Sequence, residues 1–192
     1  SIVAYGQIFV NGTASSPVTF RSSRKEPKAW DWDRIYIRGN ARSYFNHSRV
    51  MHSNFGLCVE NGNLMVSGCV FEKNSITAMY FRQADVRIEK TDIGKGHIMG
   101  IHIDAGSKVS VDSGSIKGCS RAIVCQAYGS VSLTGTRIEN NDYGIAVDGR
   151  ALVELVDALV TDNRVGIMSD AEIQKTRLLT IRGNDENMRH GS

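Results

Sequence analysis

The side chains best suited to chemistry recur along this chain at a spacing of 22 residues. They fall on two positions of the repeat: Tyr36, Tyr80 and His102 on one, and Arg38, Glu60, Arg82 and Asp104 two residues later. Exposed aromatic rings stack on the apolar faces of sugars, and an arginine pairs with a carboxylate. His102 or a carboxylate could act as a general base while Arg82 stabilises a developing anion. The pattern therefore favours a surface that binds, or acts on, an acidic sugar polymer.

A run of seven apolar residues defines the repeat that carries these side chains. They stand 22 residues apart without a slip: Ile35, Leu57, Met79, Ile101, Ile123, Ile145 and Ile167. A fixed period over most of a chain indicates a repeat architecture, in which each unit buries its apolar face against its neighbours. Small residues precede these positions, as in Gly56, Ala78 and Gly100, and we expect them to keep that edge of the structure flat.

Each repeat contains three short alternations of apolar residues. Ile101-x-Ile103 is typical of the first and Val131-x-Leu133 of the second, and the third is centred on residues such as Ile138. Alternation with a period of two, rich in β-branched residues, is typical of strands with one buried face. Equivalent strands recur a whole repeat later, so we expect them to stack in parallel rather than as hairpins.

Polar turns precede the first strand of several repeats. Two of them, Glu139-Asn140-Asn141-Asp142 and Thr161-Asp162-Asn163-Arg164, align at the spacing of the repeat. Asn and Asp tolerate left-handed backbone and bond to their own neighbours. We expect Asn141 and Asn163 to form a short amide ladder between stacked coils, with a structural role.

With three short strands in every repeat, the chain resembles the right-handed parallel β-helix proteins of the pectate-lyase-like superfamily. The resemblance covers nearly the whole chain. A leucine-rich repeat is the main alternative at this period, but the L-x-x-L-x-L framework and a helical segment are missing. The expected fold class is all-β, a single parallel β-helix or solenoid of about eight coils. We place this domain at residues 1–187, with a loop insertion at 21–31 and a disordered tail at 188–192.

The opening segment looks like the first coil of non-catalytic bacterial surface β-helix proteins. Ile8-x-Val10 and Val18-x-Phe20 supply two of its strands. The loop insertion that follows carries four positive charges and Trp30, which is a further candidate for ligand binding.

The resemblance also indicates where an enzyme would work, since enzymes of this superfamily use the outer face of one sheet. It would then be a polysaccharide lyase or glycoside hydrolase, with His102, Arg82 and Asp104 as catalytic residues. The superfamily's catalytic motifs are missing, however. Gly96-His97-Ile98 lacks a second glycine, and Arg87-Ile88-Glu89 has Glu where Lys is required.

We therefore favour a non-catalytic module that binds a polysaccharide or a protein partner through this face, with the enzyme as the alternative. The binding residues would be Tyr36, Arg38, Glu60 and Tyr80, with Trp30. The same column continues as a flat apolar strip at Val124, Ala146 and Met168. Exposed apolar strips usually mark interfaces, so we expect this one to contact a second copy of the chain or the rest of a longer chain.

Composition limits the partners and the location. The net charge of +3 suits an acidic polysaccharide but falls short of the signature of a nucleic-acid-binding protein. No stretch approaches the roughly 20 apolar residues of a membrane span. The four cysteines lack metal-ligand spacing, so we expect no metal or cofactor, with calcium left open. The resemblance to the pectate-lyase-like superfamily implies an extracellular or cell-envelope protein, although four unpaired cysteines leave a cytosolic location open.

Overall fold

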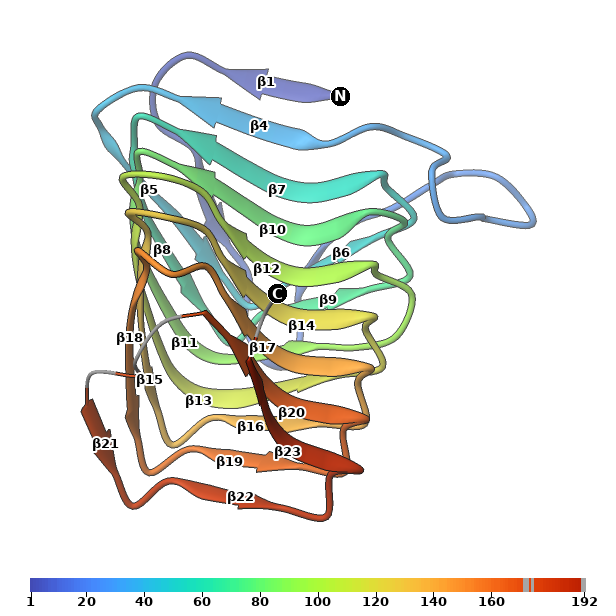
Figure 1. Ribbon diagram of the computed structural model, residues 1–192. Helices are drawn as coiled ribbons and strands as arrows, with labels where there is room; N and C mark the ends of the chain where they lie inside the picture. The colour runs from blue at the N-terminus through green and yellow to red at the C-terminus, as the bar shows by residue number, and fades with distance from the viewer. Residues whose placement is uncertain (171–172, 174, 191–192) are drawn as a thin grey trace.

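The computed structural model describes residues 1–170, 173 and 175–190 and shows an all-β solenoid (Figure 1). Its strand pairs are all parallel and join equivalent strands of successive coils. None of the described residues lies in a helix, and accordingly no helix there is long and apolar enough to cross a membrane. The expected fold class is therefore confirmed.

Three faces run along the solenoid. The first sheet has nine strands: β1 (Ile2–Ala4), β4 (Ile35–Arg38), β7 (Phe55–Glu60), β10 (Thr77–Arg82), β12 (Met99–Ile103), β14 (Arg121–Cys125), β17 (Tyr143–Val147), β20 (Val165–Ser169) and β23 (Glu186–His190). Successive strands of this sheet lie one coil apart, so the sheet runs the length of the molecule (Figure 1).

A second, 14-stranded sheet bends around a corner and supplies the other two faces. The second face comprises β2 (Phe9–Asn11), β5 (Arg42–Asn46), β8 (Asn63–Ser67), β11 (Asp85–Ile93), β13 (Lys108–Lys117), β15 (Ser130–Thr134), β18 (Leu152–Val156) and β21 (Lys175–Arg177). The third face comprises β3 (Val18–Phe20), β6 (Ser48–Met51), β9 (Val70–Glu72), β16 (Arg137–Glu139), β19 (Leu159–Thr161) and β22 (Thr180–Arg182). The long strands β11 and β13 pass around the corner and belong to both faces.

The coil length is nearly constant after a wide first coil. Ile2 pairs with Ile35, a longer step than any later one, because the 21–34 segment forms a loop that projects beside β4 (Figure 1). From Ile35 the register keeps the period of the sequence as far as Ile167, and the last step, to Met188, is one residue shorter. About seven turns of nearly equal length therefore follow the first one.

The interior is a stack of apolar columns, one from each inward position of the three strands. The seven residues that define the repeat are all fully buried. Phe71, Ile116 and Ile138 fill the third face from inside. Because each column repeats at the strand spacing of about 4.8 Å, every side chain packs on its equivalents above and below.

Each coil turns its corners with residues in the left-handed backbone conformation. At the corner between the second and third faces these are His47, Gly68, Lys90, Ser113, Gly114, Gly135, Asp157 and Leu178. At the corner before the first sheet, Asn140, Asp162 and Gly183 are examples. Gly, Asn and Asp adopt this conformation at low cost, which explains their recurrence in the polar turns.

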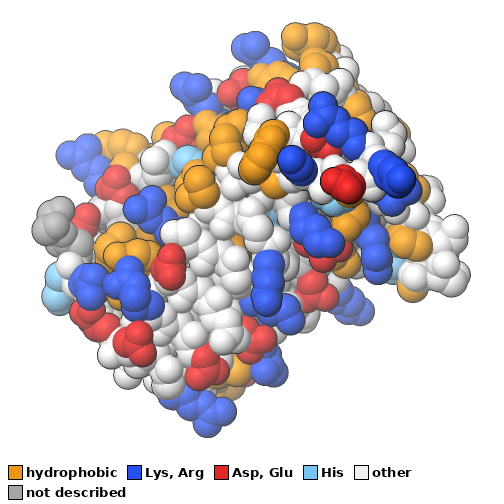
Figure 2. Space-filling model, turned by 90° about the vertical axis from the view of Figure 1, so that its right-hand side faces the viewer, with side chains coloured by type: hydrophobic (Ala, Val, Ile, Leu, Met, Phe, Trp, Pro, Cys, Tyr) orange, Lys and Arg blue, Asp and Glu red, His pale blue; other side chains and the backbone are white. Residues whose placement is uncertain are grey.

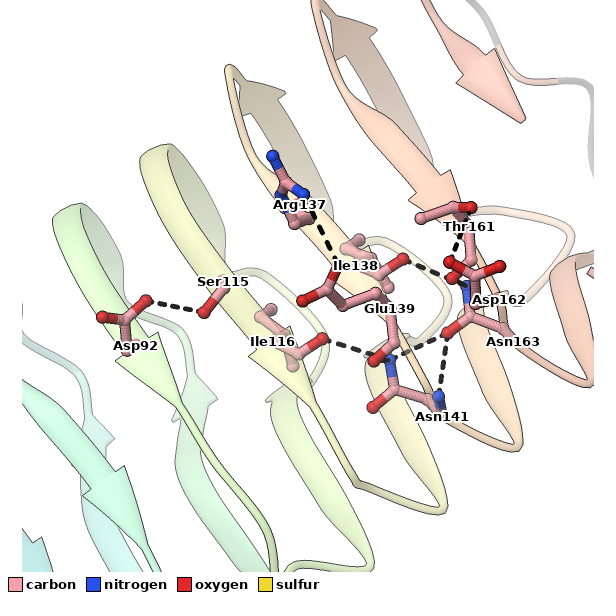
Figure 3. A network of polar contacts seen from close by, with 10 residues as sticks. All are labelled: Asp92, Ser115, Ile116, Arg137, Ile138, Glu139, Asn141, Thr161, Asp162 and Asn163. Atoms are coloured by element: carbon pink, nitrogen blue, oxygen red, sulfur yellow. Dashed lines mark hydrogen bonds and ion pairs between the residues drawn. The ribbon is translucent and has the colours of Figure 1, made fainter. Parts of the chain in front are cut away.

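The expected amide ladder is present at that last corner (Figure 3). The side-chain amide of Asn141 donates to Oδ1 of Asn163 at 2.9 Å, and Asn163 donates to Oδ1 of Asn184 at 3.0 Å. Each Oδ1 also accepts the backbone N–H of the preceding coil's residue, as Asn163 does from Asn141 at 3.0 Å. The ladder ends at Asn141, because Cys119 occupies the equivalent turn position one coil earlier, after the left-handed Gly118, and donates only its backbone N–H to Asn141. His97 occupies the same position one coil before that, after the left-handed Gly96.

Two expectations differ from the structure. The boundary at residue 187 falls inside β23, which continues to His190 and pairs with β20; residues 191 and 192 lie outside the described part. The small residues that precede the seven apolar positions, such as Gly56, Ala78 and Gly100, do not form a flat outer edge. A Cβ at Gly100 would point inward, 2.9 Å from Cγ2 of Ile116 and 2.5 Å from the carbonyl oxygen of Ala122, so the residue is small because the core is close.

Candidate ligand-binding face

The outer face of the first sheet places the predicted site residues in two columns. The register aligns Tyr36, Cys58, Tyr80, His102, Val124, Ala146 and Met168 along one of them. Arg38, Glu60 and Arg82 align beside it at the ends of β4, β7 and β10. Asp104 directly follows β12, so the N-terminal half of this face gathers all of the predicted catalytic and binding residues except Trp30.

Both tyrosines lean across one coil and donate to a carboxylate. The Tyr36 hydroxyl donates to Oε2 of Glu60 at 2.5 Å, and the Tyr80 hydroxyl donates to Oδ2 of Asp104 at 2.7 Å. The bond to Glu60 raises the pKa of Tyr36, whereas burial and then the bond to Asp104 raise the pKa of Tyr80. Both phenols therefore stay protonated and fixed in direction.

His102 packs against Tyr80, with ring centroids 5.2 Å apart in an edge-to-face arrangement. Its Nε2 atom is buried and has no hydrogen-bond partner among the described residues. Burial lowers the pKa of His102, although Gln126 and Asp104 act in the opposite direction. The imidazole is therefore neutral near pH 7, and its Nε2 atom faces protein rather than solvent.

Asp104 is the best-bonded carboxylate of the face. Besides the Tyr80 hydroxyl, it accepts the backbone N–H of Ala105 on Oδ1 at 2.7 Å. Burial tends to raise the pKa of Asp104, but these two hydrogen bonds outweigh it and the pKa is lowered. Asp104 thus stays ionised and oriented, with both oxygens already engaged.

Arg38 and Arg82 are exposed and lie two coils apart. Among the described residues neither guanidinium has an ion-pair partner within 4 Å, since Glu60, which lies between them, accepts the Tyr36 hydroxyl instead. Arg38 and Glu60, and Glu60 and Arg82, are therefore neighbours in the register without forming ion pairs. Two unpaired cations beside fixed aromatic rings can receive anionic groups from solvent.

The structure keeps Trp30 apart from this group. It lies on the loop before β4, where its backbone N–H donates to the carbonyl of Ser53 at 3.3 Å, and its side chain is 61% exposed. Trp32 is the tryptophan that packs on the core, and its indole N–H donates to the carbonyl of Met51 at 2.8 Å. Trp30 therefore flanks the face from the preceding corner.

The apolar strip is less exposed than its composition suggests. Ala146 is only 6% exposed, and Val124 and Met168 are half-buried between their cross-strand neighbours. The strip therefore offers a smaller apolar surface for an interface than three fully exposed side chains would.

The cysteines are buried and free. Cys58 lies on an outward position but is only 1% exposed, because Tyr36 and Tyr80 flank it in the register. Burial raises the pKa values of Cys58, Cys119 and Cys125 to about 12, which keeps the thiols protonated. Among the described residues no three His, Cys, Asp or Glu side chains gather as a metal-binding group.

Reasoning from the sequence missed a groove on the second face. Its floor includes Ser110 and Ser132 on β13 and β15, and its volume is about 470 Å³. The signal was present in the outward positions of the second alternation, where two serines follow the larger Met65 and Arg87. Only the stacked register shows that short side chains become adjacent there.

Comparison with known families and structures agrees with this architecture. The family described as "Right handed beta helix region" matches residues 33–184, which is most of the chain. The chain therefore belongs to the right-handed β-helix family. Comparison with curated protein sequences found no match.

Two solved structures are similar in fold. The A-module of the mannuronan C-5 epimerase AlgE6 from Azotobacter vinelandii aligns with a TM-score of 0.58 and 13% identity, over 97% of this chain and 66% of that one. An alginate lyase from Paenibacillus sp. str. FPU-7 aligns with a TM-score of 0.35 and 11% identity, over 93% of this chain and 87% of that one. The chain thus spans about two thirds of the AlgE6 A-module, and at this identity the likeness is one of fold.

Proposed function

We propose that this protein is a β-helix module that binds an acidic polysaccharide through the outer face of its first sheet, without cleaving it. The observation that carries the proposal is the pair of exposed arginines, Arg38 and Arg82, which have no ion-pair partner among the described residues. An unpaired guanidinium on a rigid strand is well suited to a carboxylate, which it can bind through two parallel hydrogen bonds.

The spacing of the face suits an extended polymer. Arg38 and Arg82 are two strands apart, about 10 Å at the usual strand spacing. Tyr36 and Tyr80 repeat with the same offset and are fixed by their carboxylate partners. A sugar chain lying across the strands would meet an aromatic ring and a cation on alternate coils. Because the tyrosines are already held in place, binding would cost little side-chain entropy.

The arrangement of the acid–base groups favours binding over catalysis. A general base must come within hydrogen-bond reach of the proton it removes, but Nε2 of His102 is buried away from the surface. Both oxygens of Asp104 already accept hydrogen bonds, and both phenols have raised pKa values. His102, Asp104 and the two phenols therefore help to hold this half of the face in shape, and none of them is set up as a general base.

Other features agree with a polysaccharide ligand. The AlgE6 A-module, similar in fold, is named for its action on mannuronan. On the side of the molecule shown in Figure 2, cations and carboxylates are interspersed rather than gathered into one positive field, unlike a nucleic-acid-binding surface. We also propose that binding needs no metal, and that the protein works outside the cell or in its envelope, where such polymers occur.

Co-elution and chain length of a polymer after long incubation with the protein test the proposal. Polymannuronate and polygalacturonate are the acidic probes and dextran is the neutral one, each with calcium and with a chelator. We expect an acidic polymer to co-elute with the protein on size exclusion at unchanged chain length, in both conditions. The double variant Arg38→Ala, Arg82→Ala should bind at least tenfold more weakly, about 1.4 kcal/mol or more.

Arg49→Ala is the matched control, because Arg49 is an exposed arginine on β6 of the third face. It should bind like the wild type. Shortened polymer, or an unsaturated product, would overturn the non-catalytic proposal and direct attention to His102, Arg82 and Asp104. If the wild-type protein binds none of the acidic polymers, the proposed ligand is wrong and a protein partner becomes the expected ligand of this face.

A further inference from the structure

The groove on the second face is separate from the site described above. Its main part, about 470 Å³, crosses β11, β13, β15 and β18. Two further hollows of about 360 and 250 Å³ adjoin it, and Asp85 borders all three. Four adjacent strands span about 14 Å, so the groove runs along the solenoid axis and across several coils.

The groove arises from the heights of stacked side chains. One outward column of the second face reads Tyr44, Met65, Arg87, Ser110, Ser132 and Glu154. Ser110 and Ser132 are short, so the surface drops between Arg87 and Glu154. The Arg87 guanidinium is held beside its own strand by Glu89, at 2.5 Å, which keeps it from filling the hollow and neutralises its charge.

The lining of the main groove offers both hydrogen bonds and apolar contact, and its charged residues are Asp85, Lys108 and Glu154. Ser110, Ser130 and Ser132 present hydroxyls on the floor, and Leu152, which is 50% exposed, supplies an apolar wall. Asp85 and Lys108 are direct cross-strand neighbours of opposite sign on the rim. Their charges offset each other, while Glu154 lies at one end of the groove and Arg42 and Arg87 border an adjoining hollow, so both signs alternate along the track.

An aromatic platform lies on the same column toward the N-terminal end. Phe9 and Tyr44 are cross-strand partners on β2 and β5, stacked with ring centroids 5.5 Å apart and an interplanar angle of 13°. Phe9 is 62% exposed. Met65, next to Tyr44 in the register, borders one of the adjoining hollows, so the platform and the groove form one track.

We infer that this track is a second binding site, for a neutral linear polysaccharide lying across the coils. The serine hydroxyls, and the amides of Asn61, Asn63 and Gln83 that border an adjoining hollow, match sugar hydroxyls. The aromatic and leucine surfaces match the C–H faces of the rings. Carboxylates and cations are mixed along the rim, with Asp85 and Glu154 lining the main groove, which disfavours a polyanion there. The inference goes beyond the proposed function, because it concerns another face and another class of ligand.

Calorimetric titration with linear hexasaccharides tests the inference. Cellohexaose, xylohexaose and mannohexaose are the probes, and we expect the wild type to bind at least one of them. Ser110→Trp fills the groove from an exposed position, so it should weaken that binding at least tenfold. Phe9→Ala removes the end of the platform and should weaken it several-fold.

Lys117→Trp is the matched control, because it places the same side chain at an exposed position at the far end of the same strand. It should bind the neutral probe like the wild type. Ser110→Trp should still retain acidic polymers as the wild type does, which separates this inference from the proposed function. The inference is wrong if the wild type binds none of the three probes, if Ser110→Trp binds as the wild type does, or if Ser110→Trp instead changes the oligomeric mass.

Discussion

The Tyr80 hydroxyl donates a 2.7 Å hydrogen bond to Oδ2 of Asp104, 24 residues later and one coil further along the solenoid. Tyr36 and Glu60 repeat this relationship two coils earlier, at the same separation in sequence. Each tyrosine therefore bridges two coils on the outer face of the first sheet. The bond holds the aromatic ring in one orientation, and a ligand that stacks on it need not pay for that ordering.

Removal of the bridging hydroxyl should destabilise the protein and release Asp104. Hydrogen bonds to charged groups contribute about 1.5–3 kcal/mol, so Tyr80→Phe should lower the free energy of unfolding by about that amount near pH 7. A lowered pKa in the folded state contributes stability above the unfolded pKa, and this contribution is lost as the pH falls through the folded pKa. Part of that acid sensitivity should disappear in Tyr80→Phe, because the pKa of Asp104 rises toward its ordinary value.

Urea unfolding at several pH values and carboxyl-carbon NMR titration of Asp104 measure these two effects. Tyr36→Phe should likewise lower the free energy of unfolding, because it removes the hydrogen bond to Glu60. Tyr5→Phe is the control, because Tyr5 is exposed and its hydroxyl makes none of the hydrogen bonds found among the described residues. An unchanged Asp104 titration in Tyr80→Phe would show that the bond is absent in solution.

The amide ladder should contribute strongly to stability at the corner before the first sheet. Asn163 is buried and donates to the carbonyls of Ile138 and Thr161 as well as to Asn184. Asn163→Ala would leave several buried groups unpaired, so we expect a loss of about 2–4 kcal/mol in the free energy of unfolding. Asn40→Ala, at an exposed position, should change it by less than about 0.5 kcal/mol. A loss below about 1 kcal/mol for Asn163→Ala would contradict a structural role for the ladder.

Stability should fall between neutral and mildly acidic pH because of His97. Burial lowers its pKa to about 4 from the ordinary 6.5, although the Phe71 carbonyl acts in the opposite direction. Between these values the unfolded chain binds a proton that the folded one does not, so the free energy of unfolding falls as the pH drops from about 6.5 to about 4 and levels off below. The single-site contribution is at most about 3 kcal/mol.

His97→Asn places at this turn the residue type that Asn74 supplies one coil earlier and removes the titrating group. We expect its unfolding free energy to depend less steeply on pH over this window than that of the wild type. Burial also lowers the pKa values of His52 and His102, so the slope should shrink rather than vanish. Chemical denaturation at half-unit pH steps measures it, and equal slopes for the two proteins would exclude His97 as a source.

Gly100 should tolerate a methyl group but not a branched side chain. A Cβ there meets Ile116 and the Ala122 carbonyl, yet the equivalent position of the next coil is occupied by the buried Ala122. We expect Gly100→Ala to cost about 1 kcal/mol and Gly100→Val about 3 kcal/mol. Thermal and urea unfolding of both variants test this, and a Gly100→Val protein as stable as the wild type would show that the column faces outward.

The solenoid itself could be predicted from the sequence. Ile35 and its equivalents recur at one fixed spacing, and three alternations per repeat require three strands with one buried face each. These features depend only on residue class and spacing, because each coil packs on copies of itself. The ladder of Asn141 and Asn163 was predictable for the same reason, since residues one period apart must stack.

The wide first coil and the end of the last strand were harder to place. The 21–34 segment has no period, and β23 carries polar residues such as Arg189 and His190 on a terminal coil that is covered on one side only. A terminal strand obtains its hydrogen bonds from the preceding coil, so polar composition alone did not reveal it.

The sequence by itself determined the coil, the register and the residues that share each outward column, because all three follow from the fixed spacing of the apolar residues along the chain. Only the tertiary structure decided what those columns do. Cys58 is buried because tyrosines flank it, Glu60 accepts Tyr36 rather than an arginine, and the serines of β13 and β15 form a groove because Arg87 is held aside. Exposure and pairing depend on the sizes and rotamers of side chains a full coil away in either direction, and a one-dimensional period does not contain that information.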